Sequence, residues 1–245
     1  MGSLSFDAAP VPVRDDVAAA LPRVWAQIGE PGSWLTGEQR VAIAAEARNV
    51  AGCAVCAERK AAVSPYAIAG EHEHLGALPE AWVDVVHRVI SDPGRLTERW
   101  FRAVTDSGIT VEEYVELIGV VVSVVGIDTF CRGIGQPAPA IPTPTRGAPS
   151  PDTPDQLNTT LAWVPTLDAD VDGPLQREFY AGAPAHIRRA LTFVPATARS
   201  FWEMANTLYL TGAQMRDFGT EYRAISHAQI EMIAGRVSAL NQCVY

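Results

Sequence analysis

Two cysteines separated by two residues are the part of this sequence best suited to chemistry. They are Cys53 and Cys56. At this spacing one thiolate can accept a hydrogen bond from the other thiol, which lowers the thiolate's pKa and raises its ionised fraction at neutral pH. Gly52 favours a break after which a helix restarts at Cys53, and Arg59 and Lys60 would add positive charge one or two turns later. The pair is therefore a candidate redox-active dithiol.

Two other interpretations of the pair remain open. In the first, both cysteines are small apolar residues in the core of an alanine-rich helix. In the second, they bind a metal together with His72 and His74 of the segment EHEH. The H-x-H spacing is not the usual spacing of zinc-finger histidines, and a solvated acidic loop explains the two histidines equally well.

Two further residues are candidates for a supporting role. Glu46 precedes Cys53 by seven residues, so its carboxylate reaches the cysteine only if the backbone bends. His87 follows Asp84 by three residues on an expected helix. His87 is either a proton donor close to the site or a satisfied, partly buried histidine.

Composition limits the classes of function. The chain has 245 residues, 48% of them hydrophobic, a net charge of −9 and a pI near 5.0. This acidity argues against nucleic acid as a partner, and no basic amphipathic run indicates a membrane surface. The apolar run 117–127 is too short to span a bilayer, and the N-terminus lacks the regions of a signal peptide. Four cysteines are too few for a disulfide scaffold, so we expect a cytoplasmic protein.

Helical periodicity dominates and strand alternation is nearly absent, so we expect an all-α fold. Capping-box sequences begin at Thr36 and Thr110. The expected helices run from Asp15 to about Ile28, from Thr36 towards Cys56, from Pro79 to about Ile90, from Leu96 to about Thr105, from Thr110 to about Arg132, from Pro184 to Thr192, from Ala196 to Leu210 and from Ser226 to the chain end.

The helix from Thr110 to about Arg132 is apolar on nearly every side in its second half, which predicts a central, buried position. Cys131 should lie in the core there, and Asp128 needs a partner if it is buried. Seven prolines follow between Pro137 and Pro154, which predict a linker or a strap along the surface. We therefore divide the chain into residues 1–135, a proline-rich linker 136–157, and residues 158–245.

The two outer parts contain an internal repeat with an offset of 190 residues. The matching pairs include a helix cap, the apolar face and a cysteine: Thr36 with Ser226, Gln39 with Gln229, Ile43 with Ile233, Ala44 with Ala234, and Cys53 with Cys243. Such a repeat predicts that the two helices pack in one core, related by an approximate two-fold axis.

At these residues the sequence resembles the alkylhydroperoxidase D and carboxymuconolactone decarboxylase family. The family pattern is a glutamate, then C-x-x-C twelve residues later, then a histidine four residues after the second cysteine. Glu231 stands twelve residues before Cys243, but the chain ends before the second cysteine position. In the first copy Cys53 and Cys56 fit, whereas Val41 and Lys60 occupy the glutamate and histidine positions.

The resemblance implies an all-helical, duplicated, alkylhydroperoxidase D-like fold that reduces hydroperoxides with its dithiol. Cys56 would be the attacking thiolate and Cys53 the resolving thiol, while Glu231 and Cys243 would belong to a second, incomplete site. Glu46, Lys60 and His87 would support the first site. An external dithiol would supply electrons, because no nucleotide-binding fingerprint is visible. A homo-oligomer is expected from the family. A decarboxylase-type lyase and a non-catalytic oligomerising module remain alternatives.

The C-terminal end of the sequence falls inside an expected helix, at Cys243-Val244-Tyr245. We therefore expect a longer reading frame, with the next codon UGA encoding selenocysteine at the second cysteine position. A frameshift, a deliberate cloning boundary and a degenerate gene are the alternatives.

Overall fold

Helices make up most of the described chain, as the helical periodicity predicts. The structure, a computed structural model, describes residues 4–180, 185–241 and 243. Its α-helices are α1 (Asp15–Gln27), α2 (Gly37–Asn49), α3 (Ala54–Ala61), α4 (Glu80–Ser91), α5 (Glu98–Asp106), α6 (Val111–Gly133), α7 (Pro174–Phe179), α8 (His186–Arg189), α9 (Pro195–Leu208), α10 (Gly212–Arg216) and α11 (His227–Leu240). Short 3₁₀ turns lie at Val50–Gly52, Pro65–Ala67 and Pro93–Arg95, and strands β1 (Leu157–Asn158) and β2 (Thr166–Leu167) pair antiparallel.

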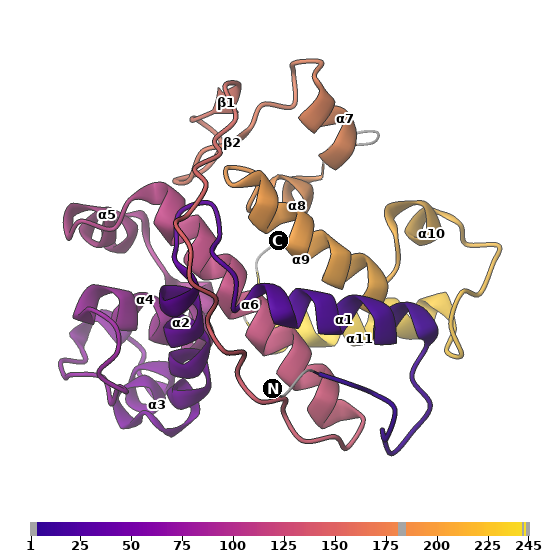
Figure 1. The fold of residues 1–245 in the computed structure, drawn as a ribbon, viewed down its shortest axis with the longest axis horizontal. Coiled ribbons are helices and arrows are strands. Elements are labelled where there is room, and N and C mark those ends of the chain that lie inside the picture. Colours follow the sequence, from indigo (N-terminus) through magenta and orange to yellow (C-terminus); the bar gives the residue numbers. More distant parts are fainter. Residues whose placement is uncertain (1–3, 181–184, 242, 244–245) are drawn as a thin grey trace.

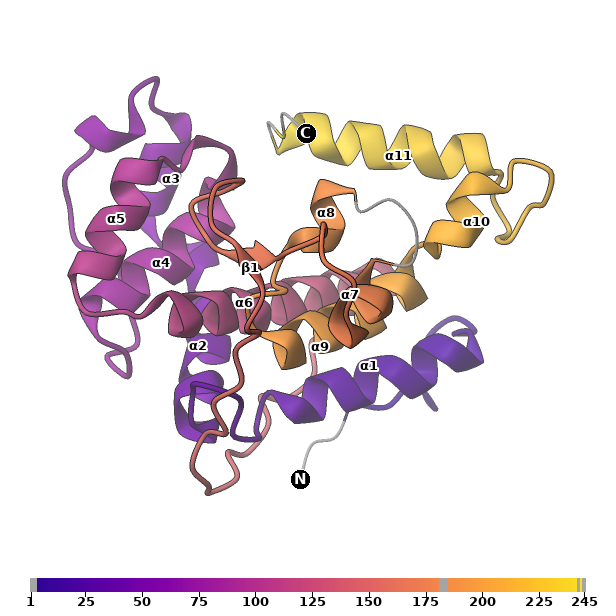
Figure 2. The same ribbon diagram turned by 90° about the horizontal axis from the view of Figure 1, so that it is seen from above.

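Helix α6 is the central element, with α1, α2, α4 and α9 packed around it (Figures 1 and 2). Its capping box is formed by Thr110 and Glu113. It is long and apolar enough to cross a membrane by composition, but 56% of its most apolar stretch is buried inside the protein. A buried core helix of a globular protein meets the same criterion, and this arrangement explains why α6 is apolar on nearly every side.

The surroundings of Asp128 and Cys131, both in α6, agree with the sequence expectations. Asp128 accepts two hydrogen bonds of 2.7 Å from Arg48 on α2, and the Arg48 guanidinium also lies over the ring of Trp25, 5.0 Å from its centroid. Cys131 is fully buried in the core. Both helices are thus fixed to each other close to the CxxC segment.

The proline-rich segment follows the surface of the first part of the chain. The Trp25 indole donates to the Ala140 carbonyl over 2.9 Å, and the Thr145 amide donates to the Gly29 carbonyl over 2.7 Å. Beyond this strap, α9 packs against α1 and α6, and Met204 of α9 belongs to the main hydrophobic core. A helix from 158–245 therefore shares its core with helices from 1–135.

Other segments differ from the sequence expectations. Between the proline-rich segment and α8, where no helix is expected, the chain forms the β1–β2 pair and α7. The helix expected from Pro184 to Thr192 is reduced to α8, and residue 184 lies outside the described residues. The helix expected to run from Thr36 towards Cys56 ends at Asn49.

Helix α11 does not share a core with α2, so the predicted two-fold packing is wrong. In Figure 1 it lies behind α1, but Figure 2 shows it at the opposite edge of the molecule from α1 and away from α2. Its capping box, from Ser226 and Gln229, is formed as predicted. Its apolar residues nevertheless remain exposed: Met232, Ile233, Val237 and Leu240. The helix was expected to continue to the chain end, but residues 244 and 245 lie outside the described residues.

Candidate functional site

The CxxC segment sits at a break between two helices, as the glycine at position 52 predicts. Helix α2 ends at Asn49, the turn Val50–Gly52 follows, and Cys53 is extended, with φ −73° and ψ 114°. Cys53 is the N-cap of α3, and Cys56 lies in the first turn of that helix. The positive end of a helix macrodipole stabilises a thiolate at these positions.

Two histidines complete a buried cluster around the two cysteines. The Sγ atom of Cys56 lies 3.3 Å from Nδ1 of His87 and 3.5 Å from Nδ1 of His72, and Cys53 Sγ lies 3.6 Å from the same His72 atom. The two imidazole rings are 4.4 Å apart and tilted by 46°. Both cysteines are 3% exposed, His87 is fully buried, and the His72 side chain is 7% exposed.

The buried carboxylate of Glu46 holds His87 in place. Nε2 of His87 lies 2.9 Å from Oε1 of Glu46, which also accepts from the Asn49 amide; Oε2 accepts from the backbone amide of Leu75. The bend after α2 lets Glu46 reach the site, but through the histidine rather than directly to Cys53. The sequence suggested Asp84 as the neighbour of His87, and the structure gives that role to Glu46.

Asp84 orients the other histidine instead. Its Oδ1 lies 3.0 Å from Nε2 of His72, and its Oδ2 accepts a 2.7 Å hydrogen bond from the Trp100 indole. Arg59 stands beside both groups, 2.9 Å from Nε2 of His72 and 3.4 Å from the same Asp84 oxygen. A guanidinium only donates hydrogen bonds, so Arg59 can donate to Nε2 of His72 only when that nitrogen carries no proton. The Asp84 carboxylate is the electrostatic partner of Arg59.

This network changes the pKa values of the groups in the cluster. Burial alone would raise the pKa of the Cys56 thiol, but hydrogen bonds from His72, His87 and Ser91 outweigh burial and lower this pKa to about 6. Burial opposes the charged form of His72 as well, yet Asp84 and the two thiols raise the His72 pKa to about 10. Against the effect of burial, hydrogen bonds with Cys56 and Glu46 raise the pKa of His87, and hydrogen bonds from His87, the Leu75 amide and Asn49 lower the pKa of Glu46. The cluster therefore favours a thiolate beside an imidazolium.

Both cysteines line a cavity of about 420 Å³, whereas His72 is not among its lining residues. Its lining includes Lys60 of α3, Ser91 of α4 and Arg132 of α6. Lys60 is exposed and lines this cavity rather than contacting a thiol. The cavity gives a small molecule a route to Cys56, with positive charge along its wall.

The residues of the second, incomplete copy lie outside this cluster. Glu231 accepts a 2.8 Å hydrogen bond from the Tyr209 hydroxyl and lies 3.6 Å from His227. Cys243 is exposed, and its backbone amide donates to the Ser238 carbonyl. The structure gives neither residue a contact with Cys53 or Cys56.

The sequence singled out the H-x-H segment without resolving which of its histidines matters. His72 points into the cluster, whereas His74 is exposed and accepts from the backbone amide of Gly76 over 3.0 Å. Spacing does not explain this difference, because side chains two residues apart lie on the same face of a regular extended segment. Asp84 and Trp100 were not candidates, because no spacing reveals the contact of Asp84 with His72 or that of Trp100 with Asp84.

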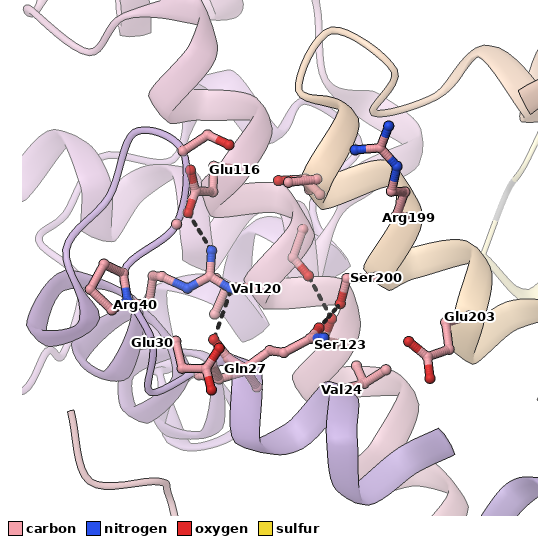
Figure 3. A pocket seen from close by; sticks show the side chains of 17 residues that line it. Val24, Gln27, Glu30, Arg40, Glu116, Val120, Ser123, Arg199, Ser200 and Glu203 are labelled. Atoms are coloured by element: carbon pink, nitrogen blue, oxygen red, sulfur yellow. Dashed lines mark hydrogen bonds and ion pairs between the residues drawn. The ribbon is translucent and has the colours of Figure 1, made fainter. Parts of the chain in front are cut away.

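A separate cavity of about 320 Å³ lies between α1, α6 and α9 (Figure 3). Figure 3 shows Arg40 directed at Glu116 and at the backbone of Gln27, and Ser200 donating to the Gln27 side chain. Several of its polar groups thus bind one another, and no cysteine or histidine is among its lining residues. This cavity offers no counterpart to the chemistry of the dithiol.

Comparison with known proteins adds no assignment: no family model, curated protein or solved structure matches this chain.

Proposed function

We propose that the protein reduces hydroperoxides with the Cys53–Cys56 dithiol, with Cys56 as the attacking thiolate. The contact that carries the proposal is the 3.3 Å approach of Cys56 Sγ to His87 Nδ1, with Nε2 of the same ring on Glu46. A carboxylate that accepts the proton on Nε2 leaves Nδ1 free to take the thiol proton. The arrangement is that of a nucleophile, a base and a group that orients the base.

The proposed reaction has three stages: reduction of the peroxide, formation of a disulfide, and reduction of that disulfide. The Cys56 thiolate attacks the terminal oxygen of ROOH, an S–O bond forms, the O–O bond breaks, and RO⁻ leaves. The imidazolium of His87 protonates RO⁻ to the alcohol. The thiol of Cys53 attacks the sulfenic acid of Cys56, which releases water and forms the disulfide. An external dithiol reduces this disulfide by two successive exchange steps and becomes a disulfide itself.

The position of the resolving thiol agrees with these roles. Cys53 and Cys56 Sγ lie within 4.8 Å of each other, one helical turn apart. A disulfide needs about 2.05 Å between the sulfur atoms, so the two side chains must rotate towards each other to close the bond. Cys131 cannot replace Cys53, since it lies fully buried in α6 and burial together with Asp128 raises its pKa.

The proposal also covers the family to which the chain would belong and its oligomeric state. The capping boxes of α2 and α11, formed at equivalent positions, support a duplicated alkylhydroperoxidase D-like ancestry. The exposed apolar residues of α11 support association with a further copy of the chain in a homo-oligomer. A free CxxC pair with a reactive thiolate fits the reducing conditions of the cytoplasm.

The test counts thiols in metal-free, fully reduced Cys243→Ser protein, in which the exposed fourth thiol is absent. One equivalent of cumene hydroperoxide should consume two thiols per chain and yield one equivalent of alcohol. Cys56→Ser should abolish peroxide consumption, while Cys131→Ser, which alters a buried thiol of α6, should react like the parent. Unchanged consumption in Cys56→Ser, with native helicity, would refute the assignment.

A further inference from the structure

The four side chains of the cluster have the composition and geometry of a tetrahedral metal site. We propose that Cys53, Cys56, His72 and His87 bind one Zn²⁺ ion in the reduced protein. Their ligand atoms lie within 4.8 Å of one another, and all four side chains are buried. The inference concerns binding and stands whether or not the dithiol reacts with peroxides.

The distances within the cluster fit zinc. With Zn–S bonds of about 2.3 Å and Zn–N bonds of about 2.0–2.1 Å, sulfur and nitrogen ligands of a tetrahedral ion stand about 3.5 Å apart. Three of the four sulfur–nitrogen distances here are 3.3, 3.5 and 3.6 Å, and the fourth is within 4.8 Å. The first three are also ordinary S···N hydrogen-bond distances, so the distances alone do not decide between a metal and a proton.

The outer contacts of the two histidines point to the metal. Each ring directs Nδ1 at the sulfur atoms and Nε2 at a buried or half-buried carboxylate: Glu46 for His87 and Asp84 for His72. Metal-binding histidines characteristically pass their second N–H to a carboxylate, which fixes the tautomer and strengthens the ligand. One relay of this kind would serve a catalytic cysteine. The second, on His72, is not needed for proton transfer from Cys56 to His87.

The carboxylates are themselves fixed. Oε2 of Glu46 accepts the Leu75 amide, and Oδ2 of Asp84 accepts the Trp100 indole. These contacts set the direction of both imidazoles before any ion arrives, so the site is preorganised.

The donor set selects zinc. Two thiolates and two imidazoles in a tetrahedral arrangement suit Zn²⁺, while Mg²⁺ and Ca²⁺ require oxygen ligands. Four protein ligands leave no open position for substrate, which is the pattern of a structural zinc site. The ion would fasten the loop between α3 and α4, which carries His72, onto the helices that carry the other three ligands.

The experiment uses the complete reduced chain, freed of metal with a chelator and titrated with Co²⁺ and then Zn²⁺. We expect one Co²⁺ per chain, intense visible bands of tetrahedral cobalt, a near-ultraviolet thiolate-to-cobalt charge-transfer band, and loss of all these on addition of one Zn²⁺. Absence of the charge-transfer band in protein whose thiols titrate as reduced would overturn the proposal, as would the weak spectrum of an octahedral ion.

Two histidines of one loop provide a matched pair of variants. His72→Ala should weaken cobalt binding more than the roughly 10–100-fold that loss of an outer-shell partner causes, because a ligand itself is removed. His74→Ala, two residues away and exposed, should bind like the parent. Equal affinity of the two variants would refute the role of His72. The wild-type cobalt spectrum keeps the proposal testable if His72→Ala fails to fold.

Failure of the metal site and failure of the peroxidase are distinguishable. Metal-free protein that consumes peroxide but gives no tetrahedral cobalt spectrum refutes the site alone. Protein that binds one Zn²⁺ but whose metal-free form does not react refutes the peroxidase alone.

Discussion

The Nδ1 atom of His87 lies 3.3 Å from the Sγ atom of Cys56, although 31 residues separate the two in the chain. The contact joins α4 to the first turn of α3, inside the protein, and Glu46 of α2 closes it from the far side of the ring. Side chains from three helices thus form one chain of contacts that ends at this sulfur atom. The same contact suits a proton on its way to a base or a ligand pair around a metal, and the two roles exclude each other at any one moment.

Ionisation of Cys56 should follow the His87 contact. In metal-free protein carrying Cys53→Ser and Cys243→Ser, the ultraviolet absorbance of the thiolate should appear as the pH rises, with a midpoint below the ordinary cysteine value, because His72 and His87 lower the pKa of Cys56. Adding His87→Gln should move the midpoint upwards, towards the ordinary cysteine value of about 8.5, because the base is lost. An unchanged midpoint in His87→Gln would show that His87 does not stabilise the thiolate.

The hydrogen bonds accepted by the Glu46 side chain should contribute strongly to the stability of the fold. Glu46→Ala leaves the Nε2 of buried His87 and the amide of Leu75 without their acceptor, and each orphaned buried donor costs about 1–3 kcal/mol. We therefore expect the free energy of unfolding to fall by about 3 kcal/mol in denaturant titrations of metal-free protein. Glu46→Gln keeps an acceptor oxygen and should lose less; an equal loss in the two variants would contradict this account.

The close approach of α6 and α9 gives a prediction about the core. A Cβ atom at Gly119 would lie 2.1 Å from Cγ2 of Thr197 on α9, so Gly119→Ala overpacks this contact. Such overpacking costs about 1–3 kcal/mol. Gly133→Ala, in the same helix but with open space around it, should cause no loss and gain up to about 1 kcal/mol. Thermal unfolding of the two variants measures the difference, and equal stability would mean that α9 does not pack there.

Peroxide should release zinc if both proposals hold. Oxidation converts two thiolate ligands, one ROOH and two protons into a disulfide, ROH and water, and the two remaining histidines are too few for a tight site. A zinc-sensitive dye should therefore report about one Zn²⁺ per chain as two thiols disappear, more slowly than metal-free protein reacts. Zinc that stays bound after the thiols are consumed would rule out the dithiol as its ligand.

Local patterns in the sequence predicted several features that the structure contains. The capping boxes at Thr36 and Thr110 and the apolar segment after Thr110 predicted two helices and the central position of the second. The glycine before Cys53 predicted the helix break. Each depends on contacts between residues a few positions apart, so a short stretch of sequence carries the whole signal.

The prediction that failed concerns packing between helices far apart in the chain. The repeat in α2 and α11 suggested a shared core, but an apolar face shows only that a helix seeks a partner, not which one. Within the described residues, α11 buries little more than His227 and remains apart from α2.

Local sequence is enough to predict that the chain is helical and that Cys53 and Cys56 begin a helix together. The groups that surround their sulfur atoms depend instead on tertiary packing. His72 rather than His74 turns inwards because the α3–α4 loop is held against Glu46 and Asn49, and His87 meets Cys56 because α4 packs between α2 and α3. Spacing along the chain cannot express such contacts, since they depend on how segments meet in space when the contacting residues are 16 to 41 positions apart.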